Sequence, residues 1–151
     1  MRRKDREMSP EFGLQVIENC QYGTLATVNQ DGRPYCIPVS PVVSEGVIYF
    51  HSAAAGHKVE NLMGCQDVCL SAVGQTQLVP EEFTTKFESG VVFGKCHQVL
   101  DEAEKIEALR CICEKYAHSN MKGFQDAITR SLGRTAVFKI EIDQVTGKAK
   151  K

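Results

Sequence analysis

The chain has 151 residues and a mass of 16.7 kDa, a size that fits one domain, residues 1–151, with a single core. Its formal net charge is −1 and charged residues make up 25%, so composition gives no general attraction to nucleic acid or to an anionic membrane. No apolar run approaches the roughly 20 residues that would cross a bilayer. Seven cysteines without a secretory signal indicate reduced thiols, and we expect a cytoplasmic protein.

The first half of the chain predicts a short helix followed by an antiparallel meander. Ser9 and Pro10 supply an N-cap and a proline at the first helical position. Three strand-forming runs then follow in close succession, separated by turn-forming residues, at positions 22–29, 34–43 and 47–51. A second helix is expected to begin near His57.

The middle of the chain predicts a hairpin and then a well-capped helix. Strands are expected at 68–73 and 87–99, with a polar loop that contains Pro80 between them. Asp101 can cap the helix that follows, and Glu104 stands where it can reach back to complete a capping box. This is the clearest helix signal in the sequence.

The last part of the chain predicts a shorter helix at 124–131 and a half-buried strand. Residues 136–142 alternate between apolar and polar side chains, whereas the basic tail at 147–151 is expected to fray. About six strands in hairpin order with few helices indicate a mainly β protein. We therefore predict a small antiparallel barrel with flanking helices rather than a parallel α/β sheet.

Two prolines, Pro38 and Pro41, interrupt the run at 34–43. Proline cannot donate to a ladder, so this strand is predicted not to pair normally on both sides. One explanation is an edge strand that is protected against aggregation. The other is that Val39 and Ser40 offer unpaired backbone and hydroxyl groups to the edge of a ligand ring, and both can hold together.

The junction at 49–62 has the features of a site for an anionic cofactor. His51 and Ser52 end the third strand, and the small residues at 53–56 would let a flat ligand approach the backbone. The helix that follows offers unpaired N–H groups, and Lys58 adds a cation, so a phosphate would be attracted there. An ordinary strand-to-helix turn has the same pattern, and that reading stays open.

Several short motifs occur in order along nearly the whole chain: Tyr22-Gly23-Thr24-Leu25-Ala26-Thr27-Val28, Asp31-Gly32-x-Pro34-Tyr35, Ile37-Pro38-Val39, Tyr49-Phe50-His51-Ser52-Ala53, Gly56-x-Lys58 and Glu88-Ser89-x-x-x-Phe93-Gly94. Together they resemble the pyridoxamine 5′-phosphate oxidase-like flavin-binding proteins, and within them the nitroimidazole-resistance branch. The resemblance implies a split β-barrel of antiparallel, Greek-key type. It also implies a homodimer that binds FMN, or alternatively FAD, in two grooves at the subunit interface.

The resemblance also assigns roles to particular residues. The isoalloxazine ring would contact Pro38, Val39 and Ser40. The ring and the ribityl chain would lie along His51, Ser52 and Ala53, and Lys58 would bind the phosphate. Glu88 and Ser89 would come from the other subunit. Asn61 lies one helical turn beyond Lys58, within reach of the cofactor, although it could equally cap the helix or face solvent. The chain departs from the family at His57 and at Ser40-Pro41, which affects the substrate pocket more than the cofactor.

A flavin carries out hydride and electron transfer itself, so the protein needs to position it and shape the substrate space. His51 could donate a proton near the flavin, because its unperturbed pKa is about 6.5; a structural hydrogen bond is its other possible role. We expect an FMN-dependent oxidoreductase acting on a small electron-poor substrate such as a nitroimidazole or another nitro-aromatic. The alternatives are a non-catalytic flavin- or haem-binding module and a pyridoxamine-phosphate oxidase-like enzyme.

Other site types are less well supported by the sequence. No glycine-rich dinucleotide or P-loop motif occurs, and Cys111 and Cys113 stand two apart on a helix, where their side chains point in different directions. No metal site is therefore predicted. The basic ends lack aromatic stacking partners, so no nucleic-acid partner is expected.

Overall fold

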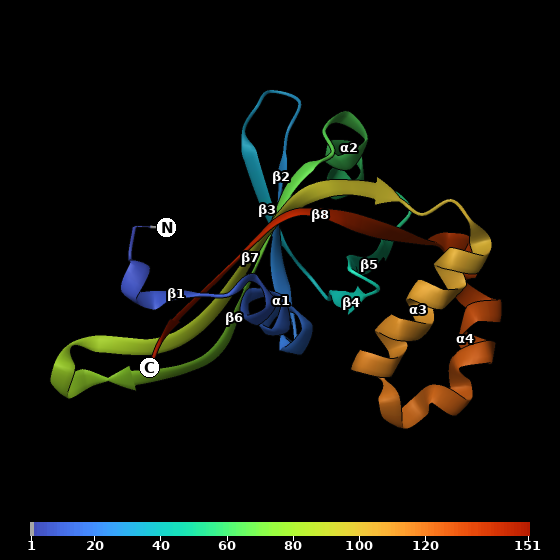
Figure 1. Ribbon diagram of the computed structural model, residues 1–151. Coiled ribbons are helices and arrows are strands. Elements are labelled where there is room, and N and C mark those ends of the chain that lie inside the picture. The colour runs from blue at the N-terminus through green and yellow to red at the C-terminus, as the bar shows by residue number, and fades with distance from the viewer. Residues whose placement is uncertain (1) are drawn as a thin grey trace.

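The computed structural model describes residues 2–151, which form one antiparallel sheet with helices at its sides (Figure 1). The strands are β1 Glu7–Met8, β2 Gly23–Val28, β3 Pro34–Val39, β4 Val42–Ser44, β5 Val47–Ala53, β6 Asp67–Val79, β7 Thr84–Gln98 and β8 Thr135–Lys150. The α-helices are α1 Pro10–Asn19, α2 His57–Gly64, α3 Glu102–Tyr116 and α4 Phe124–Ser131, with short 3₁₀ turns at Lys4–Arg6, Pro80–Glu82, His118–Gly123 and Leu132–Arg134.

The strands follow the order β3-β2-β6-β7-β8-β5-β4, and β1 pairs with the far end of β8. The sheet is mainly antiparallel, open and flanked by helices, which confirms the predicted fold class. It has eight strands rather than about six. The count differs because the run expected at 34–43 divides at Ser40-Pro41 and because the short β1 joins the sheet.

Proline explains why the run at 34–43 divides. β3 pairs with β2 on one side and is the edge strand at one end of the sheet. β4 pairs with β5 and is the edge strand at the opposite end. The chain therefore passes from one edge to the other through Ser40 and the buried Pro41. The expected edge position of this proline-containing strand is confirmed.

The core lies between the curved halves of the sheet and is made by alternate residues of its strands. Phe50 of β5 and Phe138 of β8 are buried partners in the ladder, and their rings stack with centroids 5.4 Å apart. Leu25, Leu70 and Ile140 are fully buried in the same cluster. Burial of each such side chain stabilises the fold by roughly 1.5 to 3 kcal/mol.

Helix α1 crosses the sheet at very short range. Ser9 caps it as predicted, because its Oγ accepts a hydrogen bond from the Phe12 N–H at 3.2 Å. Glycine makes the close crossing possible: a Cβ added at Gly13 would stand 2.8 Å from the Thr146 carbonyl oxygen, and one added at Gly90 would collide with the Gly13 carbonyl. The helix backbone therefore rests directly on β7 and β8.

Helices α3 and α4 cover the other end of the molecule, where Val137, Leu109 and Ile128 form a second buried cluster. Asp101 caps α3 as predicted, since its carboxylate accepts a bond from the Glu104 N–H at 2.8 Å. The second bond of a capping box, from the backbone N–H of Asp101 to the Glu104 side chain, is replaced by other contacts. The Glu104 carboxylate accepts bonds from Tyr49 and Lys139 instead, at 2.9 and 2.8 Å, which ties α3 to the sheet.

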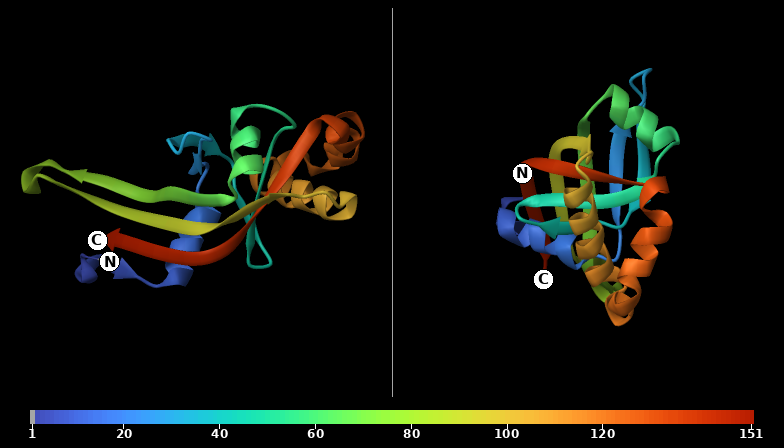
Figure 2. Two further views of the ribbon diagram at one scale, coloured as in Figure 1. Left: turned by 90° about the horizontal axis from the view of Figure 1, so that it is seen from above. Right: turned by 90° about the vertical axis from the view of Figure 1, so that its right-hand side faces the viewer.

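The prediction that residues 147–151 fray is wrong, because β8 continues to Lys150. Its last residues pair with β7 on one side, and Gly147 and Lys148 pair with β1 on the other. The strand predicted at 68–73 likewise ended too early, since β6 continues to Val79 and the expected polar loop reduces to the turn at Pro80–Glu82. These extensions build an arm that projects from the body of the molecule (Figure 2).

In the described part of the chain, no helix is long and apolar enough to cross a membrane.

Candidate functional site

A shallow hollow of ≈ 310 Å³ lies where the edge strand β3, the end of β5 and the start of α2 meet. Its lining residues are Tyr35, Ile37, Pro38, Ser52, Ala55, Gly56, His57, Lys58 and Val59. We call this the Lys58 hollow. The β5–α2 junction that the sequence indicated as a cofactor site is therefore folded against the proline-bearing strand, although the two segments are separate in the chain.

Lys58 gives the hollow a cation without a protein counter-ion. Its side chain is half-buried, its Nζ stands 5.5 Å from the centroid of the Phe50 ring, and burial lowers its pKa. No carboxylate within residues 2–151 forms an ion pair with it. A partly desolvated, unpaired ammonium group favours an anionic ligand.

The start of α2 adds backbone donors to that cation. Gly56 is the N-cap with φ 127°, a conformation that favours glycine, and no side chain caps the helix. Apart from its chain neighbours, no protein atom lies within 4 Å of the position that a Gly56 Cβ would take. The start of α2 therefore borders open space, and an uncapped helix start beside a lysine is an arrangement that suits a phosphate group. The residues present thus fit the phosphate end of a flavin nucleotide.

Asn61 ties α2 to the sheet from inside. It is 4% exposed, and its amide donates hydrogen bonds to Thr27 Oγ1 at 3.0 Å and to Asn29 Oδ1 at 2.8 Å. The Asn29 oxygen also lies 2.9 Å from His57 Nε2, and the His57 ring stacks on Tyr35 with centroids 4.2 Å apart. This network fixes the direction in which α2 leaves β5, so Asn61 lies beneath the site with its amide donors used internally.

Strand alternation separates His51 from Ser52. Ser52 is half-buried and lines the Lys58 hollow, whereas His51 is exposed and follows Tyr49 on the other face of β5. Although part of the His51 side chain is exposed to solvent, the surrounding protein partly desolvates its ring, and this desolvation together with the nearby charge of Lys58 lowers the pKa of His51. Ala53 is exposed at the end of the strand, beside Thr135.

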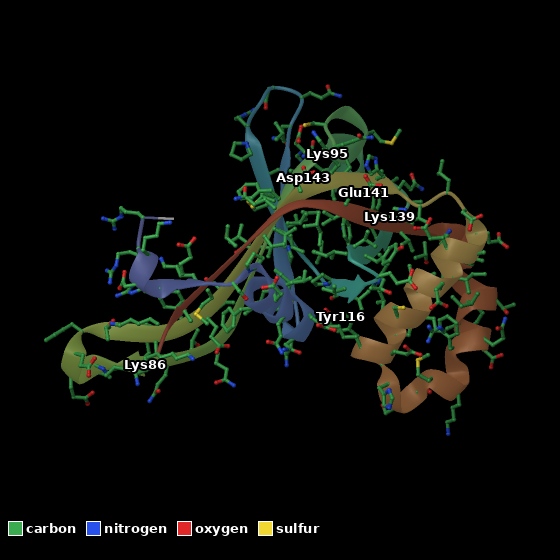
Figure 3. All side chains as sticks on the ribbon, viewed as in Figure 1. Lys86, Lys95, Tyr116, Lys139, Glu141 and Asp143 are labelled. Carbon is green, nitrogen blue, oxygen red and sulfur yellow. The ribbon has the colours of Figure 1, made fainter. Side chains whose placement is uncertain are left out.

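The three residues expected beside the flavin ring occupy different environments. Pro38 is exposed and lines the hollow, Val39 is buried in the main core, and Ser40 is half-buried at the crossing between edges. The next carbonyl, that of Pro41, accepts hydrogen bonds from Lys115 Nζ at 2.6 Å and from Tyr116 Oη at 2.7 Å. Figure 3 shows Tyr116 at the end of α3, from where it holds this crossing in place.

Glu88 and Ser89 lie on the arm, away from the Lys58 hollow. Glu88 lines a larger groove of ≈ 760 Å³ between α1 and β6, and that groove shares no lining residue with the Lys58 hollow. The Glu88 carboxylate accepts a bond from the Gln75 N–H at 3.4 Å, and the Ser89 hydroxyl donates to the Lys148 carbonyl at 3.5 Å. One chain therefore does not bring these two residues to Lys58.

Tyr35 is a lining residue that sequence reasoning did not select. The two-residue period of a strand could have indicated it, because Tyr35 and Ile37 stand two residues apart and therefore lie on the same face of β3, and both line the hollow. His57 was noted as a departure from the family pattern, and the structure places it in the stack that supports the hollow. Its contacts with Asn29 and Tyr35 join segments distant in sequence, so no local pattern indicates them.

The sequence and the fold are both similar to those of known proteins. A family model described as pyridoxamine 5′-phosphate oxidase matches residues 13–149. No curated protein matches the sequence. Among solved structures, a candidate 5-nitroimidazole antibiotic resistance protein from Bacteroides thetaiotaomicron is similar with a TM-score of 0.76 and 22% identity, over 96% of this chain and 90% of that one.

Two further solved structures share the fold. One is an FAD-binding protein from Mesorhizobium loti, with a TM-score of 0.67 and 21% identity over 97% of this chain and 98% of that one. The other is an FAD and haem binding protein from Mycobacterium smegmatis, with a TM-score of 0.79 and 15% identity over 97% of this chain and 74% of that one.

Proposed function

Because the chain belongs to the pyridoxamine 5′-phosphate oxidase family, a flavin-binding family, we propose that it is an FMN-dependent oxidoreductase acting on a small electron-poor substrate, such as a nitroimidazole or another nitro-aromatic. The observation that carries the proposal is the unpaired Lys58 beside the open start of α2. This pair of features would hold the flavin phosphate. FMN needs only this one phosphate site, and the similar FAD-binding proteins make FAD the alternative.

The remaining residues of the hollow would position the rest of the cofactor. When bound, the flavin supplies the electron-transfer chemistry. Ser52 would hydrogen-bond the ribityl chain, and Pro38 would limit the approach of the ring at the β3 edge, where no ladder partner competes for space. His51 is the titratable residue next to Ser52 in the sequence, and it would move a proton to the substrate from the part of β5 beyond its pairing with β4.

A homodimer completes the proposed site. Glu88 and Ser89 lie on the arm and do not line the Lys58 hollow. They would therefore contact a flavin only in the hollow of a second copy of the chain. The arm exposes Leu78 and Phe83 at 75% and 98%, as expected for a surface that a partner covers. The similarity to a candidate nitroimidazole resistance protein supports the substrate class.

The test is flavin binding by wild-type protein and by Lys58→Ala. The wild type should purify yellow with FMN, and loss of one charge-assisted phosphate contact should weaken FMN binding by roughly 10- to 100-fold. Lys58→Arg should retain most of the affinity, and Lys122→Ala on the 3₁₀ turn His118–Gly123 is the surface control. Mass spectrometry of the released cofactor separates FMN from FAD. Equal FMN affinity in Lys58→Ala would contradict the phosphate assignment.

A second function, storage or shielding of a flavin without turnover, is favoured by one observation. The side chains of His51 and Ser52 face opposite sides of β5, so a flavin that lies along Ser52 could lack a proton donor. Reduction of the bound flavin by a nicotinamide donor, followed by reoxidation with a nitro-aromatic acceptor, supports the enzyme. A flavin that undergoes neither step supports the binding module.

A further inference from the structure

The crossing from β3 to β4, at Ser40 and Pro41, is held in place by side chains from another part of the chain. Pro41 has no backbone N–H, so its carbonyl is the one polar backbone group through which this residue can be tied down. The Pro41 side chain is fully buried. Two residues at the end of α3 supply donors to the carbonyl: Lys115 Nζ donates to it at 2.6 Å, and Tyr116 Oη donates to it at 2.7 Å.

The same two side chains also contact the end of α1. Lys115 Nζ lies 3.4 Å from the Ile17 carbonyl oxygen, and Tyr116 Oη lies 3.5 Å from that of Cys20. The ammonium group stands 4.9 Å from the centroid of the Tyr116 ring, so the two side chains also attract each other. We call Lys115 and Tyr116 the α3 pair. Figure 3 shows Tyr116 between α3 and α1, and the pair joins three segments that are distant in sequence.

The charge of Lys115 is costly at this position. Its side chain is half-buried, and burial lowers its pKa. No carboxylate within the described residues 2–151 forms an ion pair with it. Burial of an unpaired charge is unfavourable, but an ammonium group makes a stronger hydrogen bond than a neutral donor. The crossing is therefore held more firmly than apolar packing alone would hold it.

We propose that both residues of the α3 pair are positioning residues for the flavin ring. They act through Pro41: a proline restricts the backbone of the residue before it, here Ser40, and the bound carbonyl fixes the peptide group that follows. Pro38, which lines the Lys58 hollow, and Ser40 belong to the segment assigned to the ring. This inference rests on the proposed function. It gives α3, none of whose residues line the hollow, a part in placing the cofactor.

Removal of each donor tests the α3 pair on the full chain. Lys115→Met and Tyr116→Phe should each weaken the binding of FMN, and equally of riboflavin, which has the ring without the phosphate, by roughly 2- to 10-fold. Lys115→Arg keeps a charged donor and should restore part of both affinities. Lys105→Met is the matched control. Lys105 Nζ also donates from α3 to a backbone carbonyl, that of Leu132 at 2.7 Å, so its loss should leave both affinities unchanged.

The two flavins separate the α3 pair from the phosphate site. Lys58→Ala should weaken FMN binding and leave riboflavin binding unchanged, whereas the α3 variants should weaken both by the same factor. The visible absorption of bound FMN should also change in the α3 variants, because it reports on the surroundings of the ring. Tyr116→Phe removes one oxygen atom and decides the question if Lys115→Met does not fold.

Two results would overturn the α3 pair and leave the proposed function intact. One is a loss of affinity in Tyr116→Phe that is confined to FMN. The other is a Tyr116→Phe variant whose flavin affinities and bound-FMN spectrum equal those of Lys105→Met. A wild-type protein that binds no flavin overturns both the proposed function and this inference.

Discussion

At the scale of single residues, the position of His51 decides what it can do. Its pKa is lowered by burial and by Lys58, so the folded protein holds a neutral imidazole at pH 7. The unfolded chain takes up this proton at a higher pH, near about 6.5. The stability that depends on a neutral His51 is therefore present above that pH and falls as pH decreases. Proton donation from the imidazolium, by contrast, increases as pH falls.

We predict that His51→Ala keeps most of its flavin but loses turnover. If His51 donates the proton, reoxidation by a nitro-aromatic per bound flavin should slow on the order of 10²-fold. The increase in rate that proton donation by His51 would give as pH falls should disappear as well. Single-turnover reoxidation measured from pH 5 to 8, with flavin occupancy on the same samples, tests this. His118→Ala, at an exposed position, is the control. Unchanged turnover per flavin with an unchanged pH profile rules out the catalytic role.

The residues around α2 show which parts of the site can be predicted from sequence. Lys58 and Gly56 could be found because a helix start after small residues is a local pattern. The support beneath them could not, since Asn61 bonds to Thr27 and Asn29 across the fold. Tyr49 and Glu104 are a similar case, because their hydrogen bond joins β5 to α3. Contacts between distant segments leave no spacing in the sequence to detect.

At the scale of elements, the helices were predictable and the lengths of the strands were not. Ser9 and Asp101 cap α1 and α3 as their sequence positions indicated, and α4 spans the predicted residues. The ends of β6 and β8 depend instead on cross-strand partners. Lys148 and Lys150 resemble a solvated tail, yet they belong to β8 because β7 supplies the ladder beside them.

We predict that Gly90→Ala lowers the free energy of unfolding by disturbing the packing of α1 on the sheet. The added Cβ would collide with the Gly13 carbonyl oxygen, which belongs to backbone and has little freedom to move away. Overpacking of this kind typically costs about 1 to 3 kcal/mol, which urea denaturation can measure. Gly133→Ala is the matched control, since no protein atom lies within 4 Å of its Cβ position. Equal stability of the two variants would show that α1 can shift without cost.

At the scale of the whole molecule, the proposed function requires two chains. Light scattering should give about twice the chain mass of 16.7 kDa, with an interface above roughly 2,000 Å² in total. Dilution should release flavin as the dimer dissociates, because Glu88 and Ser89 would then leave the site. The control is a titration with added FMN, which should shift the equilibrium back toward dimer. Flavin affinity that does not change with protein concentration contradicts a shared site.

The position of β8 between β7 and β5 has a consequence for how the chain folds. β5, which carries Ser52 into the Lys58 hollow, is held along its length by β8, and its register joins Phe50 to Phe138, far away in the chain. Hairpins such as β6–β7 close quickly, whereas a distant pairing pays the loop entropy first and forms slowly. We therefore expect the sheet to begin forming before the Lys58 hollow is complete. On this expectation the proposed cofactor site forms late in folding, when β8 pairs with β5.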